Sequence, residues 1–190
     1  MTDLKHLKIE KTDGVARITL ARPKHNVLNI EMMNELNAQL EALAADSTLK
    51  CVVILGDGPS WCAGVEVADH KPEMVDEMIA VFNGIFERID KLEVPVIAAV
   101  HGACMGGGME VAIACDIIVA DKNAVFGQPE IKVGVFPPIA AQILPRIIGR
   151  KAAMELIFSG RIFSAQEALQ IGLVNRVVTE EELKSATTEI

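Results

Sequence analysis

The sequence predicts a mixed α/β domain in which short buried strands alternate with amphipathic helices. Apolar runs of strand length recur along the chain, segments with helical spacing lie between them, and turns rich in glycine or proline separate the two. With 190 residues, 51% of them hydrophobic, the chain is long enough for one hydrophobic core. We therefore expect a single domain over residues 1–190.

Turn and cap signals define the first elements. Residues 7–20 alternate polar and apolar side chains around an Asp-Gly turn at 13–14, which indicates a hairpin. Asn29 is a candidate N-cap for a helix that runs to about Ala45. The apolar run 51–55 then predicts a buried strand.

The same signals continue to the end of the chain. They predict a helix within 73–92, a strand at 96–100, a helix at 109–115, a strand at 117–120, and helices that begin at capping boxes 164–167 and 179–182. Strands and helices thus alternate over most of the sequence, as an α/β fold requires.

Composition excludes several classes of protein. The formal net charge is -8 and no run of Lys or Arg is present, so nucleic acid is not an expected partner. No apolar stretch approaches the ~20 residues that a membrane helix needs, so we expect no membrane partner. The N-terminus lacks the order of charges and apolar residues of a signal peptide, and a cytoplasmic location is the expectation.

The four cysteines are Cys51, Cys62, Cys104 and Cys115, and none has metal-ligand spacing with another cysteine or a histidine. We interpret them as small buried hydrophobic residues and expect no metal site. The alternative is a catalytic nucleophile, for which Cys104 is the candidate because His101 is close in sequence.

Two glycine-containing turns, at 61–65 and 106–108, each follow a predicted core strand. Glycines let a ligand approach the main chain, and the second turn leaves unpaired amides at the positive end of a helix. One amide from each turn, aimed at the same point, would polarise a carbonyl group. The simpler interpretation is that the glycines only permit turns and close packing. A phosphate loop is a weaker alternative, because no Gly-Lys-Ser/Thr sequence follows.

Two glutamates border apolar segments near these turns. Glu110 lies in the first turn of an otherwise apolar helix, and Glu130 follows a turn and precedes the mostly apolar stretch 131–139. Two carboxyl groups that share a site favour one ionised and one neutral form, which is an acid and a base. Taken singly, each could equally be a solvated side chain or a charge that complements a helix dipole.

At these residues the sequence resembles the crotonase superfamily, or enoyl-CoA hydratase/isomerase family, over nearly its whole length. The most specific match is the segment 101–130, which contains Gly-Ala-Cys-Met-Gly-Gly-Gly-Met-Glu110 and Phe-Gly-Gln-Pro-Glu130 in the family's order and spacing. The segments 22–29 and 61–65 are similar to the family's CoA-binding segment and first oxyanion turn.

The resemblance implies an oxyanion hole made by the backbone NH groups of Val65 and Gly107, with Glu110 and Glu130 as the two catalytic carboxylates. It also implies contacts to coenzyme A at a set of N-terminal and turn residues, namely Asn26, Leu28, Ala63 and Gly64. Because both glutamates are present, it favours hydration of an enoyl-CoA. The implied acyl-CoA is the substrate, and no separate cofactor or metal is expected.

The implied fold is a crotonase-like ββα spiral with two roughly perpendicular sheets and flanking helices. The implied assembly is a homotrimer or homohexamer. We expect the 190 residues to form the core domain without the family's C-terminal helices.

The sequence departs from the family pattern at two places, one in the expected substrate pocket and one in the first oxyanion turn. A stretch that is commonly glycine-rich reads Val-Phe-Pro-Pro-Ile-Ala-Ala at 135–141, which assigns Phe136, Pro138 and Ile139 to the substrate pocket. This variant is similar to hydratases of cyclic dienoyl-CoA thioesters in aromatic degradation. Glu66 replaces a usual aspartate, with an expected effect on the cap of the next helix.

Other functions on the same scaffold stay open. A double-bond isomerase or a CoA thioester hydrolase would use the same fold, and so would a non-catalytic CoA-binding module that forms oligomers.

Overall fold

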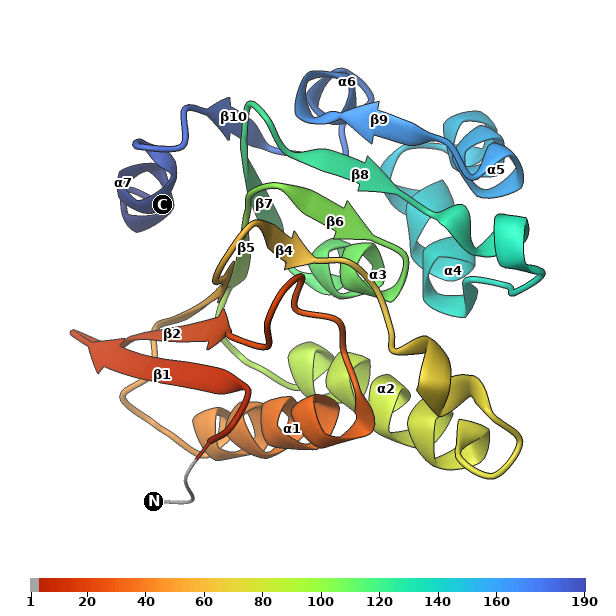
Figure 1. Cartoon of the computed structure of the whole chain (residues 1–190). Helices are drawn as coiled ribbons and strands as arrows, with labels where there is room; N and C mark the ends of the chain where they lie inside the picture. The colour runs from red at the N-terminus through yellow and green to blue at the C-terminus, as the bar shows by residue number, and fades with distance from the viewer. Residues whose placement is uncertain (1–3) are drawn as a thin grey trace.

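The structure is a computed structural model that describes residues 4–190 (Figure 1). Its strands are β1 (Leu7–Thr12), β2 (Val15–Leu20), β3 (Cys51–Gly56), β4 (Ser60–Cys62), β5 (Val96–Val100), β6 (Ala103–Met105), β7 (Ile117–Asp121), β8 (Val125–Gly127), β9 (Ile162–Ser164) and β10 (Arg176–Val178). Its α-helices are α1 (Ile30–Ala44), α2 (Val75–Asp90), α3 (Gly107–Ala114), α4 (Pro138–Ile147), α5 (Arg150–Ser159), α6 (Ala165–Gln170) and α7 (Leu183–Thr188). Two 3-10 helices are η1 (Val67–His70) and η2 (Pro129–Val133).

A ββα unit repeats along the chain. In β3–β4–α2, β5–β6–α3 and β7–β8–α4, the first strand joins a six-stranded sheet and the second joins a four-stranded sheet. Neighbouring units pair in parallel in both sheets, which are set at an angle to each other (Figure 1). The chain therefore advances as a spiral, and the predicted α/β spiral fold is confirmed.

The six-stranded sheet has the order β1-β2-β3-β5-β7-β10. Only the β1–β2 hairpin is antiparallel, and the later strands pair in parallel. Its central strands are nearly continuous apolar runs, since helices or the other sheet cover their faces. The main core lies between this sheet, the small sheet and helices α1 to α3, and α7 covers the other face beside β5 and β7.

The strongest sequence patterns predicted their elements well. The hairpin, the strands at 51–55, 96–100 and 117–120, and the helix within 73–92 are confirmed. Asn29 caps α1 as expected, because its side chain accepts a hydrogen bond from the Met32 amide. Ser164 likewise caps α6 by accepting from the Glu167 amide.

Other expectations were wrong in detail. The helix α3 begins at Gly107, two residues earlier than expected, so the glycine run lies partly inside it. Thr179 and Glu182 do bond to each other, yet α7 begins only at Leu183, because residues 180–182 form turns instead of a helical turn. The mostly apolar stretch 131–139, for which no burial was predicted, is largely exposed.

Within residues 4–190, the helices are all too short or too polar to span a bilayer.

Candidate functional site

The glycine turn between β6 and α3 carries the first part of the site. Gly106 has φ +53°, a left-handed conformation that glycine adopts without a steric penalty. Gly107 then starts α3, and the amides of a first helical turn have no partner within the helix. The Gly107 NH donates to no acceptor in the described residues 4–190.

The turn after β4 supplies a second free amide. Leu28 NH donates to Gly64 O and Glu66 NH donates to Leu28 O, each at 2.8 Å, so that Val65 faces Leu28 in a parallel bridge. These two hydrogen bonds occupy the Gly64 carbonyl and the Glu66 NH, which flank Val65 in the chain. The Val65 NH itself has no acceptor in the part of the chain described.

These two turns lie against each other. A Cβ atom placed on Gly107 would come within 2.5 Å of Val65 Cγ2 and 3.1 Å of Phe82 Cζ, so no other residue fits at 107 without displacement. The structure thus brings together the two predicted oxyanion residues. It also shows that the glycines serve both close packing and exposure of amides, since a Cβ on Gly108 would collide with Cys62.

Glu110 lies one helical turn after Gly107 and is only 3% exposed. Its Oε1 accepts hydrogen bonds from the amides of Ile139 and Ala140, each at 2.9 Å. The pKa of Glu110 is raised to about 7, mainly because the side chain is buried. Of the smaller effects, the Ala140 and Ile139 amides lower this pKa and the charge of Glu130 raises it. Both protonation states of Glu110 are therefore populated near neutral pH.

The two amides that bind Glu110 belong to the first turn of α4. Pro137 occupies the N-cap position and Pro138 the first helical position, where the missing NH and fixed φ of proline are tolerated. Pro137 has no side chain that could cap the helix, and Glu110 provides the acceptor from α3 instead. The Phe-Pro-Pro sequence therefore starts the helix that orients the carboxyl group.

Glu130 lies on η2, and its carboxylate reaches over the glycine turn. A Cβ on Gly106 would come within 2.8 Å of Glu130 Oε1 and 3.9 Å of the Gly64 Cα. Burial raises the pKa of Glu130, while a bond from its own backbone amide lowers it. The charge of Glu130 also raises the pKa of Glu110, so the two predicted carboxylates are close enough to interact electrostatically.

The arrangement combines two free amides with two carboxyl groups of raised pKa. Amides held by packed backbone stabilise a developing oxyanion without reorganisation. Carboxyl groups with a pKa near 7 are suited to give and take protons at neutral pH. The chemistry that fits is proton transfer next to a polarised carbonyl group.

The four residues expected to contact coenzyme A differ in exposure. The Asn26 side chain is buried, accepts from the Arg22 amide and donates to Asp57 O and Ser60 O, which holds the 22–28 loop on the β4 turn. Leu28 is also buried, and Gly64 has no side chain, so their contacts to a ligand would come from the main chain. Ala63 is half-buried at the same turn.

The three expected pocket residues surround the start of α4. Phe136 is 66% exposed, Pro138 is exposed and Ile139 is half-buried, with its amide on Glu110. Two residues near the site were missed in the sequence. Phe82 lies against Gly107, and Gln128 is a fully buried amide beside Glu130.

Glu66 does not cap η1, because no side-chain bond caps that helix. Its carboxylate instead binds Arg22 at 3.0 Å, and Arg22 also donates to Val27 O, which ties the N-terminal loop to the oxyanion turn.

The thiol of Cys104 is fully buried, and burial raises its pKa well above the ordinary value. That thiol is not a nucleophile in this environment.

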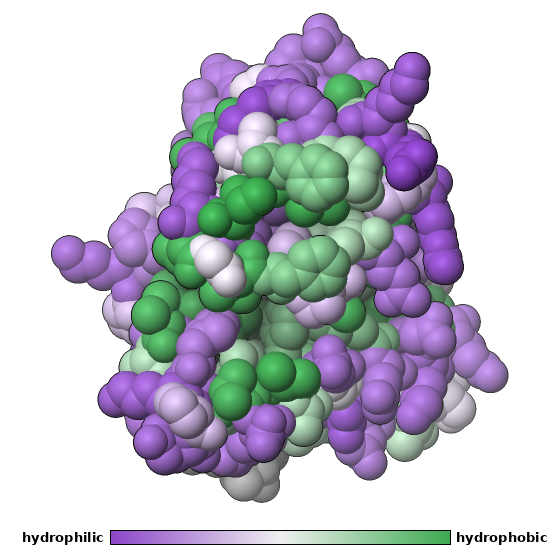
Figure 2. Space-filling view, turned by 90° about the vertical axis from the view of Figure 1, so that its right-hand side faces the viewer, coloured by the Kyte–Doolittle hydropathy of each residue, from purple (hydrophilic) through white to green (hydrophobic). Residues whose placement is uncertain are grey.

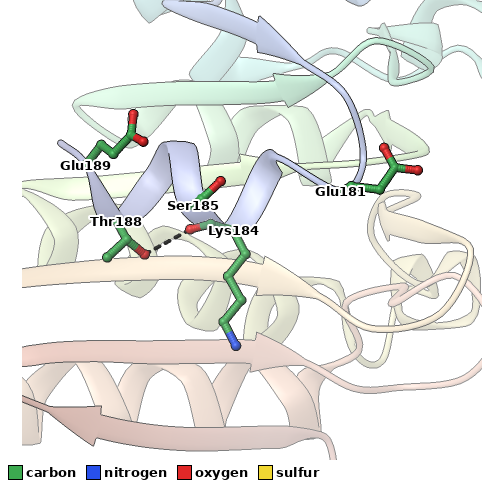
Figure 3. A pocket seen from close by; sticks show the side chains of 5 residues that line it. All are labelled: Glu181, Lys184, Ser185, Thr188 and Glu189. Atoms are coloured by element: carbon green, nitrogen blue, oxygen red, sulfur yellow. Dashed lines mark hydrogen bonds between the residues drawn. The ribbon is translucent and has the colours of Figure 1, made fainter.

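A surface hollow of about 500 Å³ lies elsewhere, beside α7 (Figure 3). It is lined by Glu181, Lys184, Ser185, Thr188 and Glu189. The Thr188 hydroxyl donates to the Lys184 carbonyl of the same helix, and none of the lining residues belongs to the predicted site. Across residues 4–190, no three His, Cys, Asp or Glu side chains are grouped as metal ligands.

Known proteins are similar to this chain over nearly its whole length. The family model described as Enoyl-CoA hydratase/isomerase matches residues 10–190. The short-chain-enoyl-CoA hydratase of Clostridium acetobutylicum is 39% identical, over 99% of this chain and 74% of that protein. The cyclohexa-1,5-dienecarbonyl-CoA hydratase of Thauera aromatica is 33% identical, over 92% and 67%. A crystal structure of an enoyl-CoA hydratase from Bacillus anthracis has a TM-score of 0.93 at 32% identity, over 97% and 74%.

Proposed function

Because the chain belongs to the enoyl-CoA hydratase/isomerase family, we propose that it is a hydro-lyase that adds water to a conjugated enoyl-CoA thioester. The observation that carries this proposal is the pair Glu110 and Glu130 beside two backbone amides that have no acceptor within residues 4–190. A hydratase needs both a proton acceptor for water and a proton donor for carbon, and this pair offers both.

In the proposed reaction, the thioester oxygen accepts hydrogen bonds from the Val65 and Gly107 NH groups. One ionised glutamate takes a proton from a water molecule while the oxygen of that water attacks the β-carbon. The electrons of the double bond move onto the thioester oxygen, and an enolate forms. The second glutamate, protonated, then gives its proton to the α-carbon. The net change is the addition of one water molecule, and neither a metal nor a separate cofactor takes part.

The roles of the two Glu110 oxygens follow from their contacts. Oε1 accepts two backbone hydrogen bonds, which favour a lone pair over a proton at that atom. Proton exchange with substrate or water therefore occurs at Oε2. Coenzyme A would lie along the 22–28 loop and the 63–65 turn, held by main-chain groups.

The test is a product assay with purified protein and a short straight-chain 2-enoyl-CoA. Hydration predicts loss of the ultraviolet absorbance of the conjugated thioester, a mass gain of one water, and no free thiol. A free thiol would indicate thioester hydrolysis, and a displaced double bond without mass gain would indicate isomerisation. Binding of acyl-CoA without turnover would indicate a non-catalytic module, and each of these three results overturns the proposal.

A cyclic dienoyl-CoA is the second substrate proposed. Its support is the similarity to the Thauera aromatica protein and the rigid Pro137-Pro138 segment beside Glu110. The discriminating measurement is kcat/KM for cyclohexa-1,5-diene-1-carbonyl-CoA against crotonyl-CoA. A ratio above one supports aromatic degradation as the context, and a ratio far below one assigns the protein to straight-chain substrates.

We also propose a homotrimer or homohexamer. Figure 2 shows apolar side chains gathered in a band on the side formed by α4, α5 and η2. Exposed large apolar residues from these segments are Ile131, Val133, Ile147 and Phe158. Such a band is uncommon on a monomer and typical of an interface. Light scattering after size exclusion should give three or six times the mass of one chain, and a monomer would contradict this.

A further inference from the structure

Gln128 is a polar side chain with no exposed surface, and it immediately precedes the proline that starts η2. Its amide group faces the carboxyl group of Glu130. With the amide nitrogen turned toward Glu130, it donates to both carboxylate oxygens at 2.9 Å each. A buried amide is costly unless its polar atoms find partners, so this contact fixes the position of both side chains.

The chemistry of an amide suits a partner that changes its protonation state. An ionised carboxylate only accepts hydrogen bonds, whereas a carboxylic acid also donates one. A glutamine amide has a donor at one end and an acceptor at the other, and half a rotation about its last torsion exchanges the two. The same side chain can therefore contact Glu130 as an anion, through its NH₂ group, and as an acid, through its carbonyl oxygen. The second orientation turns the NH₂ group toward donors at the other end of the amide, so the anion is the better-satisfied partner.

We propose that Gln128 is a positioning residue that holds the Glu130 carboxyl group in one place in both protonation states by turning its amide. This inference rests on the proposed hydratase function, in which Glu130 changes protonation in each turnover. Without such a partner, the carboxyl group would rotate or draw in water when its proton leaves, and its distance to the substrate carbon would change.

Other charged groups do not offer Glu130 the same contact. Glu110 on α3 faces it through its charge, without a direct hydrogen bond. The remaining charged residues on η2 and on the α5–β9 side are Lys132, Arg150, Lys151, Glu155 and Arg161, of which Arg161 bonds to Glu155 and Glu167 and the others are exposed. Gln128 is thus the partner whose orientation depends on the Glu130 proton.

The first experiment uses the unaltered protein and does not depend on turnover. Carbon-13 NMR of side-chain carboxyl groups, assigned with Glu130→Gln, follows the protonation of Glu130, while nitrogen-15 NMR follows the side-chain amide of Gln128. The proposal predicts that the Gln128 amide signals shift with pH at the same midpoint as Glu130 and become independent of that midpoint in Glu130→Gln. Titration of Glu130 with a stationary Gln128 amide signal overturns the proposal.

The second experiment measures kinetics of Gln128→Leu, which keeps the side-chain bulk and removes both hydrogen-bonding ends. We expect kcat to fall roughly tenfold to a hundredfold, at the lower end of acid–base contributions, with KM changed less than about threefold. The pH at which kcat is half-maximal should also move. Gln166→Leu, on the exposed face of α6, is the matched control and should keep the unaltered kcat and pH profile.

The two experiments separate this inference from the function on which it rests. If the unaltered protein hydrates no enoyl-CoA, the proposed function fails, yet the NMR titration still tests the amide rotation. If hydration occurs and Gln128→Leu keeps full kcat with an unchanged pH profile while remaining folded by circular dichroism, the positioning role is wrong.

Discussion

Glu110→Gln should stabilise the fold at alkaline pH while it removes activity. The folded protein holds the Glu110 proton to about pH 7, whereas an unfolded chain releases it near the ordinary pKa of 4.5. Between these values the folded state binds more protons than the unfolded state, so this group lowers the free energy of unfolding as pH rises. Below pH 4.5 both states are protonated, and the contribution vanishes.

The size of the effect follows from the same two pKa values. At about 1.4 kcal/mol for each pH unit, the ionised form costs on the order of 3 kcal/mol of stability above pH 7. A glutamine resembles the protonated acid, since its carbonyl oxygen can still accept from the Ile139 and Ala140 amides. The variant should therefore match the unaltered protein near pH 4.5 and exceed it by up to about 3 kcal/mol at pH 8.5.

The assay is urea-induced unfolding of both proteins at several pH values in this range. The informative quantity is the difference in unfolding free energy between variant and unaltered protein, because the other titrating groups are common to both. Glu87→Gln, on the exposed face of α2, is the matched control for loss of one carboxylate. A difference for Glu110→Gln that does not change with pH, or a variant that is less stable at pH 8.5, would refute the argument.

Three further substitutions test other parts of the site. Gly107→Ala places a Cβ 2.5 Å from Val65 Cγ2 and should lower kcat about a hundredfold, as loss of an oxyanion donor does. The double variant with Val65→Ala removes that clash and should restore part of the rate. Asn26→Ala removes three hydrogen bonds from a buried side chain and should lower the free energy of unfolding by roughly 2–4 kcal/mol in thermal or urea unfolding, whereas a merely ligand-binding residue would leave stability unchanged. Phe136→Ala, at an exposed position, should change stability by less than about 0.5 kcal/mol yet alter kcat/KM between short and bulky acyl groups, and equal kinetics for both would remove it from the pocket.

The sequence predicted the elements whose own residues carry a long periodic or turn signal. The β1–β2 hairpin has an Asp-Gly turn, α1 has its Asn29 cap, and β5 follows Pro95 as an unbroken apolar run. The family resemblance implied a second sheet, but its strands could not be located from local patterns, because β4, β6, β8 and β9 have three residues each and are too short to show alternation. Its strands form through pairing with neighbours that are distant in sequence.

The candidate site was predictable in its residues and only partly in its geometry. The motifs around Gly107 and Glu130 indicated two turns and two carboxylates, and the structure places them together. Helix α4 was not predicted, since its start is marked only by Pro137-Pro138 and its cap comes from Glu110 on another helix. A cap supplied from a distant element leaves no local signal, and the role of the α4 amides at Glu110 emerged only from the fold.

The central claim is that the Val65 and Gly107 amides polarise a thioester carbonyl beside the two glutamates. The most direct measurement is the infrared stretching frequency of a carbon-13-labelled carbonyl in a bound, unreactive acyl-CoA analogue. The account predicts a lower frequency for the bound carbonyl than for the same analogue in water, with the shift largely lost in Gly107→Ala. A bound carbonyl that absorbs at its solution frequency in the unaltered protein would contradict it.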